Sequence, residues 1–242
     1  SILVLGASGM LGNALVRFLQ KQPNVEVKGT VRSELKKGLF PEQCRNCIIS
    51  GIDIDRIETV SESLKAHSPD IVVNCIGLVK QLSDVNDPLV ALPINSLFPH
   101  MLAKICLDVG ARLIHISTDC VFNGKKGMYT ETDLADARDL YGLSKFMGEV
   151  QYQNTVTLRT SIIGHELDSN KSLVDWFLSQ TGAVDGFKRA IFSGLPTVEL
   201  SRVIHQFVIP NRQRRAPSCP SQPTGIAIRR QATVTQIPGR RK

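Results

Sequence analysis

Short apolar runs alternate with amphipathic segments along the first two thirds of the chain. The run Ile2–Leu5 ends at a glycine, and apolar residues then recur at helical spacing through Leu11, Leu15 and Leu19. An unbroken apolar run predicts a buried strand, and a period of about 3.6 residues predicts a helix with one buried face. The same criteria predict further strands at 25–31, 47–52, 70–75, 112–117 and 155–159, and further helices at 57–66, 89–109 (interrupted near Pro93 and Pro99) and 140–152.

The predicted strands are apolar on both faces, and most are followed by a helix. This pattern is typical of a parallel sheet that is covered by helices on both sides. Right-handed crossovers between the strands make such a sheet doubly wound. Residues 1–160 hold about six strands, the number in a full dinucleotide-binding sheet. We therefore expect an α/β, Rossmann-type fold with an NAD(P)-binding domain at 1–160.

The alternation weakens after Thr160, where we expect a small, apparently truncated substrate lobe at 161–209. One helix is predicted within it at 198–207, and the only Trp lies in 173–178. After Pro210 aromatic residues vanish, and Pro, Ser, Gln and Arg dominate. Such a segment cannot bury enough apolar surface to offset the entropy of ordering it, so 210–242 is expected to be a disordered basic tail.

The net charge of +7 comes entirely from this tail, which holds eight basic residues and no acidic one. The remaining residues, 1–209, carry 21 basic and 22 acidic side chains. The folded part is therefore close to neutral, and the basic balance does not indicate binding to nucleic acid. A basic nucleic-acid arm would also need aromatic residues or a partner motif, which the tail lacks. We expect no nucleic-acid partner.

Composition and cysteine spacing narrow the class of protein further. Hydrophobic residues make up 42% and charged residues 21%, a balance typical of soluble globular proteins. No apolar run reaches the length of a membrane span, and the first residues show no signal-peptide pattern, so we expect neither. Cys44 and Cys47 form one CxxC without a second pair, so we expect no metal site. Reduced thiols indicate a cytoplasmic location, and a homodimer is compatible with the sequence.

A glycine turn follows the first strand, with the sequence Gly-Ala-Ser-Gly-Met-Leu-Gly at 6–12. A GxxGxxG between a strand and a helix brings backbone N–H groups and the helix N-terminus close to a pyrophosphate. Its place after a strand and before a helix makes a plain tight turn the weaker interpretation. The expected cofactor contacts in this turn are Gly6, Ser8, Gly9, Met10, Leu11 and Gly12.

The end of the second strand carries Arg32 where NAD-binding proteins usually have an acid. A guanidinium suits a 2′-phosphate, so NADP is the expected cofactor, with NAD as the alternative. Asp53, after the third strand, is a candidate acceptor for the adenine amino group. An exposed surface Arg and a solvated turn Asp are the competing interpretations of these two residues.

The ends of two later strands carry further candidates. Asn74, Cys75 and Gly77 lie at the end of the fourth strand, where a turn of small residues would let a cofactor ribose pass. Ser117, Thr118 and Asp119 follow the fifth strand. Ligands of open α/β sheets bind outside these carboxyl ends. We therefore expect the first group and Ser117 to contact cofactor. A hydroxyl of the second group is expected to hydrogen-bond a substrate oxygen, and Asp119 is a candidate to assist in catalysis.

Tyr141 and Lys145 form a YxxxK on a predicted helix, so both lie on one face. An ammonium beside a phenol is expected to lower the pKa of the phenol. The tyrosine could then exchange a proton with a carbonyl or an alcohol near neutral pH. A YxxxK alone is often a solvated helix face; the glycine turn and the hydroxyls at 117–118 strengthen the catalytic interpretation.

These motifs, together with Val121-Phe122-Asn123-Gly124 after the fifth strand, resemble the extended short-chain dehydrogenase/reductases. The similarity is strongest to the dTDP-4-dehydrorhamnose reductase branch and its sugar-nucleotide 4-reductase relatives, and it extends over about residues 1–208. The resemblance implies that Tyr141 donates a proton, that Lys145 holds the nicotinamide ribose and tunes Tyr141, and that Thr118 positions the substrate oxygen. It also implies that Asn95 supports a proton-relay water.

The resemblance places two further segments. Residues 159–161 resemble the stretch that passes beside the nicotinamide, and 192–197 resemble a substrate-domain strand that leads into a helix. The expected reaction is NAD(P)H-dependent reduction of a nucleotide-linked 4-keto-deoxy-sugar for polysaccharide synthesis. Two alternatives remain open: an epimerase or dehydratase that retains NAD, and a non-catalytic NADP-binding subunit like the regulatory subunit of methionine adenosyltransferase.

The tail departs from this family, whose members continue with further strands and helices of the substrate lobe. We interpret 210–242 as an out-of-frame translation, or as a truncation with readthrough, because the composition changes abruptly after Ile209. Translating the same DNA in the other two frames tests this interpretation. It fails if neither frame yields apolar, periodic sequence.

Overall fold

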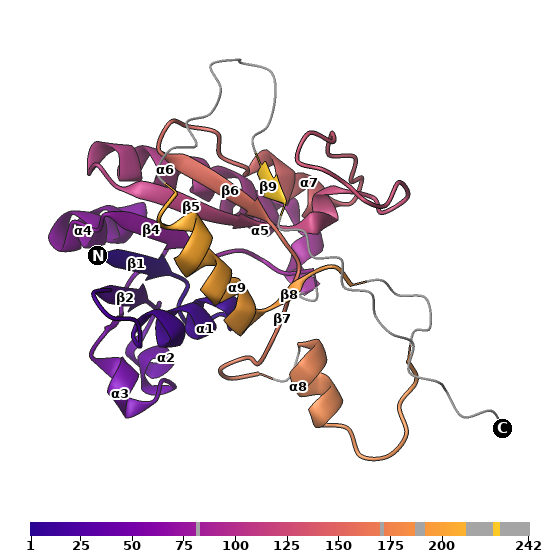
Figure 1. Ribbon diagram of the computed structural model, residues 1–242, viewed down its shortest axis with the longest axis horizontal. Coiled ribbons are helices and arrows are strands. Elements are labelled where there is room, and N and C mark those ends of the chain that lie inside the picture. The colour runs from indigo at the N-terminus through magenta and orange to yellow at the C-terminus, as the bar shows by residue number, and fades with distance from the viewer. Residues whose placement is uncertain (81–82, 170–171, 187–191, 212–224, 228–242) are drawn as a thin grey trace.

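A computed structural model describes residues 1–80, 83–169, 172–186, 192–211 and 225–227 of the chain. Its main sheet has seven strands, all parallel, in the order β3-β2-β1-β4-β5-β6-β9. The order runs outward in both directions from β1, as the doubly wound prediction requires, so the α/β, Rossmann-type fold is confirmed (Figure 1). The strands are β1 (Ile2–Leu5), β2 (Val27–Thr30), β3 (Ile48–Ile49), β4 (Ile71–Asn74), β5 (Arg112–Ser117), β6 (Thr155–Arg159) and β9 (Gly225–Ala227).

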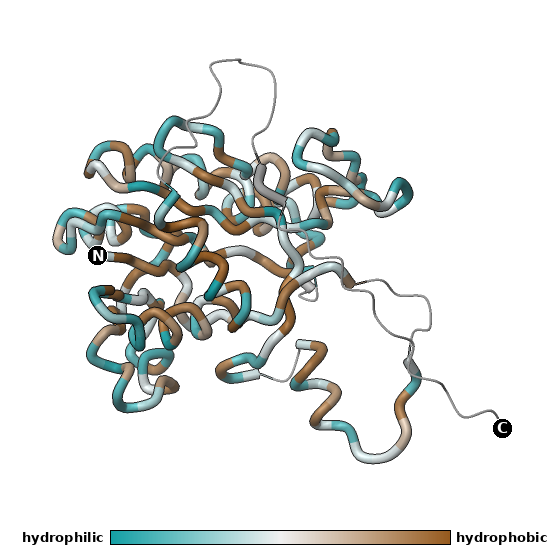
Figure 2. The backbone as a smooth tube through the Cα atoms, viewed as in Figure 1, coloured by the Kyte–Doolittle hydropathy of each residue, from teal (hydrophilic) through white to brown (hydrophobic). Residues whose placement is uncertain are grey.

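The two faces of the sheet bury two separate apolar cores, because successive side chains of a strand point to opposite faces. Ile2 and Val4 of β1 pack with α1 (Met10–Leu19) and α9 (Thr197–Val203). Leu3 and Leu5 pack instead with α4 (Ile57–His67) and α6 (Phe98–Asp108). Apolar strands therefore run through the middle of the molecule, as the colouring of Figure 2 shows.

The helix predicted at 89–109 is not interrupted at its prolines. It runs through α5 (Pro88–Leu92), a π-helical turn (Pro93–Leu97) and α6. The backbone N–H of Phe98 donates to the carbonyl of Pro93, a wider bond than in an α-helix. Pro93 and Pro99 have no N–H to donate, and the wide turn lets the helix pass both of them without a break.

This continuous helix, Pro88–Asp108, is long and apolar enough by composition to cross a membrane, although it contains no unbroken apolar run of that length. Its second half is nevertheless part of the core. Phe98, Leu102 and Cys106 are buried against the sheet and α4. Core helices of globular proteins have the same length and composition.

The predicted substrate lobe divides into two parts. A small parallel pair, β7 (Ile162–Ile163) and β8 (Leu195–Pro196), lies beside the main sheet, and α8 (Leu173–Leu178) stands away from it (Figure 1). In contrast, α9 and the π turn after it (Ile204–Val208) pack on α1 and belong to the main core. The polar residue His205 even makes an edge contact with Phe18 of α1, at 6.0 Å between ring centroids.

One described part of the predicted tail forms structure. Gly225–Ala227 pair in parallel with β6 and become the seventh strand, which differs from the expectation that 210–242 is disordered. The remainder of the predicted tail, at 212–224 and 228–242, lies outside the described residues.

The remaining elements are short and connect the strands. They are α2 (Glu34–Gly38), α3 (Glu42–Arg45), α7 (Leu140–Met147) and two 3-10 turns (Ser83–Asn86 and Asp119–Val121). Helix α7 ends five residues before the predicted limit of 152. A Cβ on its C-cap residue Gly148 would lie 1.9 Å from the carbonyl oxygen of Asn95, so the chain meets the π turn at the point where α7 stops.

Candidate active site

The glycine turn joins β1 to α1 at the carboxyl edge of the sheet. Gly6 has φ of +76°, a conformation that favours glycine, and its carbonyl accepts from the N–H of Gly9 at 3.0 Å. A Cβ on Gly12 would lie 2.2 Å from the same carbonyl oxygen, so only glycine fits there. Gly9 caps α1 without a side chain, which leaves the first N–H groups of the helix available for an anion.

Lys145 of α7 is buried, and its ammonium donates to the carbonyl of Ile116 on β5 at 2.8 Å. Burial lowers the pKa of Lys145 to about 8, although the carboxylate of Glu149 opposes this shift. A Cβ on Gly77 would lie 3.3 Å from Lys145 Nζ. A Cβ there would also lie 3.3 Å from Asn95 Oδ1, so glycine at this position lets the loop after β4 lie close to the ammonium.

Asn95 ties this region to α7. It lies in the π turn and is 1% exposed. Its Oδ1 accepts from the N–H of Leu78 at 2.9 Å, and its Nδ2 donates to Ser144 Oγ at 3.1 Å. Ser144 in turn donates to the carbonyl of Tyr141 at 2.9 Å. The loop after β4, the π turn and the first turn of α7 are thus held together by one chain of hydrogen bonds.

Tyr141 lies in the first turn of α7, after the N-cap Asp139, which accepts from the N–H of Gly142. Burial raises the pKa of Tyr141 to about 12, and a hydrogen bond with the side chain of Thr118 partly opposes this shift. The prediction that Lys145 lowers the pKa of this phenol is therefore wrong for the chain by itself. The cause is that Lys145 donates to a backbone carbonyl while desolvation dominates at the phenol. Tyr141 stays protonated at neutral pH.

Asp119 connects the end of β5 to the small β7–β8 pair. Its Oδ1 accepts from Ser161 Oγ at 2.5 Å, and its Oδ2 accepts from Ser193 Oγ at 3.5 Å. The hydroxyl of Thr118 accepts from the N–H of Cys120 at 3.1 Å, which caps the short turn that follows. The sequence contains no signal for the two serine contacts, because they join segments far apart in the chain.

Two residues expected to contact cofactor use their side chains inside the protein. Ser117 donates to Glu149 Oε1 at 2.8 Å. Asn74 Nδ2 donates to Nδ1 of the buried His115 at 3.1 Å, and its Oδ1 accepts from the N–H of Ile76 at 3.0 Å. Burial also holds the pKa of His115 well below its usual range, so this imidazole is neutral. Both side chains therefore support the edge of the sheet from within.

The adenosine end of the predicted site is more open. Arg32 follows β2 and is exposed, with no partner for its guanidinium among the described residues. Asp53 is half-buried, and its Oδ1 accepts from the N–H of Asp55 at 3.3 Å. Close by, Lys36 of α2 pairs with Asp168, which connects this end to the loop before α8.

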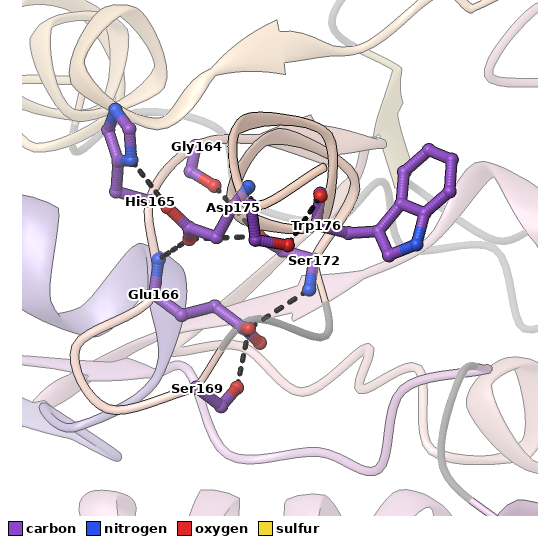
Figure 3. Close-up of polar contacts among 8 residues, drawn as sticks. Gly164, His165, Glu166, Ser169, Ser172, Asp175 and Trp176 are labelled. Atoms are coloured by element: carbon purple, nitrogen blue, oxygen red, sulfur yellow. Dashed lines mark hydrogen bonds and ion pairs between the residues drawn. The ribbon is translucent and has the colours of Figure 1, made fainter. Parts of the chain in front are cut away.

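Figure 3 shows a polar cluster at the base of α8 that no motif in the sequence indicates. Asp175 lies 2.6 Å from Nδ1 of His165 and accepts from the N–H of Glu166 at 2.6 Å. Ser172 caps the helix, and its hydroxyl donates to Asp175. The cluster fixes the turn before α8, while the ring of Trp176, 41% exposed, points away from it. No group of three or more potential metal-binding side chains lies among the described residues.

The free energy of unfolding is expected to fall as the pH rises above 9. Cys106 is fully buried, and burial raises the pKa of its thiol from 9.0 to about 12. The folded chain thus keeps a proton that the unfolded chain releases, and stability falls by about 1.4 kcal/mol per pH unit for each such proton. Burial acts in the same direction at Cys75 and Tyr141. Lys145 opposes the fall only up to its unfolded pKa of 10.5.

Urea unfolding between about pH 8 and pH 11 measures this slope. The variant Cys106→Ala loses the volume of one sulfur atom and some stability at every pH, but its stability should decline less steeply, by one proton. Equal slopes in the two proteins would contradict the assignment.

Comparison with known proteins adds to this geometry. The model of the RmlD substrate binding domain family matches residues 1–182. The chain is 36% identical over 147 residues to the probable low-salt glycan biosynthesis reductase Agl14 of Haloferax volcanii, covering 60% of this chain and 46% of that protein. It is 33% identical over 148 residues to a dTDP-4-dehydrorhamnose reductase of Streptomyces griseus, covering 61% and 43%.

A solved structure shares the fold. The dTDP-4-dehydrorhamnose reductase of Bacillus anthracis, in complex with NADP, matches with a TM-score of 0.69 and 21% identity, over 88% of this chain and 71% of that one. The chain spans about half the length of the curated relatives it matches.

Proposed function

Since the chain belongs to the RmlD substrate binding domain family, we propose that it is an NAD(P)H-dependent reductase of a nucleotide-linked 4-keto-deoxy-sugar. The observation that carries the proposal is that Tyr141 and Lys145 of α7 lie at the end of β5, where Thr118 is close enough to lower the pKa of Tyr141 and Lys145 donates to the carbonyl of Ile116. A relative of the chain is a dTDP-4-dehydrorhamnose reductase, and another is a probable glycan biosynthesis reductase. A role in polysaccharide synthesis follows from the same comparison.

The residues present fit a bound dinucleotide. The turn at 6–12 has no room for a side chain at Gly12 and presents the uncapped start of α1, as a pyrophosphate requires. Lys145 lies beside Gly77 at the ends of β4 and β5, where it is proposed to hold the ribose at the nicotinamide end. Ser8 lies in the glycine turn and Arg32 follows β2, at the adenosine end of the predicted site. A guanidinium there suits a 2′-phosphate, so NADP is the proposed cofactor, with NAD as the alternative. The cofactor, when bound, supplies the hydride.

The chain's own residues supply the proton and the orientation of the carbonyl. The phenol of Tyr141 is protonated at neutral pH, which is the form that a proton donor needs. Thr118 can donate to the same substrate oxygen, and the turn at 119–121 holds its side chain in place. The charge that develops on the oxygen is then stabilised by two hydroxyl groups that are already oriented. Asn95 is proposed to support the water that returns a proton toward Lys145.

The substrate is proposed to enter from the side of the loop at 121–139. A cavity of about 290 Å³ lies there, next to the N-cap of α7, and is lined by Asn123, Lys125, Ala137, Arg138 and Asp139. The negative charge of Asp139 is paired with Lys80 at 3.7 Å. Lys125 and Arg138 are the other charged residues of the lining, so the cavity carries a net positive charge. A cationic cavity beside the proton donor suits the diphosphate of a nucleotide sugar.

A panel of nucleotide-linked 4-keto sugars, each with NADPH and with NADH, tests the proposal. Substrate-dependent loss of the reduced-nicotinamide absorbance is expected for at least one sugar. One tightly bound NAD per purified chain, without net consumption of reduced cofactor, would favour the epimerase or dehydratase instead. Cofactor binding without any turnover, together with a co-purifying catalytic subunit, would favour the regulatory role.

Arg32→Ala is expected to weaken NADPH binding by about ten- to a hundred-fold and to change NADH affinity little. The variant lacks the guanidinium and therefore its charge-assisted hydrogen bond to the 2′-phosphate, which contributes about 1.5–3 kcal/mol to binding. Fluorescence titration with both cofactors measures the two affinities. Lys65→Ala removes an exposed positive charge from α4 and serves as the control. An equal loss for NADPH and NADH would rule out a 2′-phosphate contact.

A further inference from the structure

A buried ion pair lies beneath the catalytic edge of the sheet. Arg159 of β6 donates from Nε to Glu149 Oε1 at 2.8 Å and from Nη2 to Oε2 at 2.7 Å. The side chains are 1% and 3% exposed, and the guanidinium also stacks over Phe122 at 5.2 Å. Removing two charges from water costs about as much as such a pair returns, so a buried pair adds little net stability. Stability therefore does not account for this arrangement.

The carboxylate of Glu149 also reaches the strand that carries the predicted catalytic hydroxyl. It accepts from Ser117 Oγ at 2.8 Å, while Lys145 donates to the carbonyl of Ile116 at 2.8 Å. The segment at 145–149 thus holds two consecutive residues at the end of β5, and Thr118 is the next residue. Through Arg159 the same carboxylate fixes the end of β6.

We propose that Glu149 is a positioning residue for the reaction, which holds the end of β5 and maintains the positive charge of Lys145. The role in catalysis rests on the proposed reductase function. The effect of Glu149 on Lys145 and on the end of β5 can be measured without any substrate. Glu149 touches neither the proposed substrate nor the proposed cofactor. It acts through Lys145 and Ser117.

The charges around Lys145 support this role. Burial lowers the pKa of the ammonium, and Glu149 is the largest influence in the opposite direction, followed by Cys75. Burial raises the pKa of the Cys75 thiol to about 12, so it carries no charge at neutral pH. The imidazole of His115, which faces Lys145 from β5, is neutral as well, and so is the phenol of Tyr141 on the same helix. Among the described groups that act on Lys145, the carboxylate of Glu149, itself paired with Arg159, is the remaining charge of opposite sign.

Titration of Lys145 by NMR tests the proposal without cofactor or substrate. The protein is labelled with ¹³C and ¹⁵N in lysine, and the Lys145 signal is the one missing from the spectrum of Lys145→Met. In the unchanged chain Lys145 should titrate near pH 8. In Glu149→Gln, where the amide oxygen can still accept from Ser117, we expect the protonated fraction at pH 8 to fall from about one half to below one tenth.

A second variant guards against loss of the fold, because Glu149→Gln leaves Arg159 unpaired in the interior. Glu149→Gln combined with Arg159→Met removes both charges at similar volume, a change that proteins often tolerate. Lys145 should titrate at lower pH in this protein too, by a smaller amount. Glu199→Gln, which breaks the surface pair with Arg202 on α9, is the matched control and should leave Lys145 unchanged. An unchanged titration of Lys145 in the folded double variant would overturn the proposal.

The consequence for binding provides an independent measurement. The pH at which NADPH affinity begins to fall should move down together with the titration of Lys145, whereas a purely structural role of Glu149 would lower affinity equally at every pH. These outcomes are separate from the reductase assay. A chain that reduces no sugar nucleotide refutes the proposed function, while the NMR titration still decides the role of Glu149.

Discussion

Tyr141→Phe is expected to lower the turnover number by about 10²- to 10⁴-fold, the contribution usual for a positioned proton donor. The phenol is half-buried and protonated at neutral pH, with Thr118 close to it, and Phe keeps its ring while removing its proton. Cofactor affinity should stay within about three-fold of the unchanged chain, because the loss concerns an interaction made in the transition state. Steady-state rates and NADPH titration measure the two quantities.

Tyr152→Phe is the control for this substitution. Tyr152 lies after α7, is 41% exposed and contacts His100 at 3.0 Å through its hydroxyl, away from the sheet edge. Its removal should leave turnover within about two-fold. If Tyr141→Phe also kept its turnover number, Tyr141 would not be the proton donor.

Gly12→Ala is expected to abolish measurable NADPH binding and to destabilise the fold by about 3 kcal/mol or more. The new Cβ would lie 2.2 Å from the carbonyl oxygen of Gly6 and 2.9 Å from Cα of Ala7, and both neighbours are backbone atoms that cannot rotate away. Relief requires α1 to move from β1, which separates the glycine turn from the helix N-terminus. Urea unfolding and cofactor titration measure both effects.

The matched control is Gly38→Ala, at the end of α2, where an added Cβ meets nothing within 4 Å. Alanine favours a helix over glycine by about 0.5–1 kcal/mol, so this variant should be unchanged or slightly more stable. Normal NADPH binding by Gly12→Ala would show that the turn is not the pyrophosphate site.

The central part of the fold was predictable because its strands are buried on both sides. The strands at 112–117 and 155–159 have the predicted limits, and most of their residues are buried because both strands have a neighbour on each side in the sheet. The edge strand β3 has two residues instead of the predicted six, because an edge strand pairs on one side only. The π turn at 93–97 was not predicted, and the segment that packs against it at Gly148 lies 53 positions along the chain from Asn95.

In the candidate site, too, features set by neighbouring residues were predictable, and contacts between distant segments were not. Helical spacing correctly places Tyr141 and Lys145 on α7, and strand ends correctly place the residues at 117–119 at the same edge. Spacing does not reveal burial, however, and burial decides the pKa of the phenol. The partners of Ser117 and Asp119 could not be found either, since Glu149, Ser161 and Ser193 come from other elements.

The two serine hydroxyls on Asp119 have a consequence for how this architecture can diversify. They hold the β7–β8 pair to Asp119, the residue next to Thr118. The position of this pair relative to the proposed catalytic hydroxyl is therefore fixed. Segments beyond that anchor, such as α8, have no buried side chain of their own and can change in sequence or length without shifting Thr118. Substitutions in such outer segments can therefore change which sugar the protein prefers, while the position of Thr118 and the proposed proton transfer stay the same.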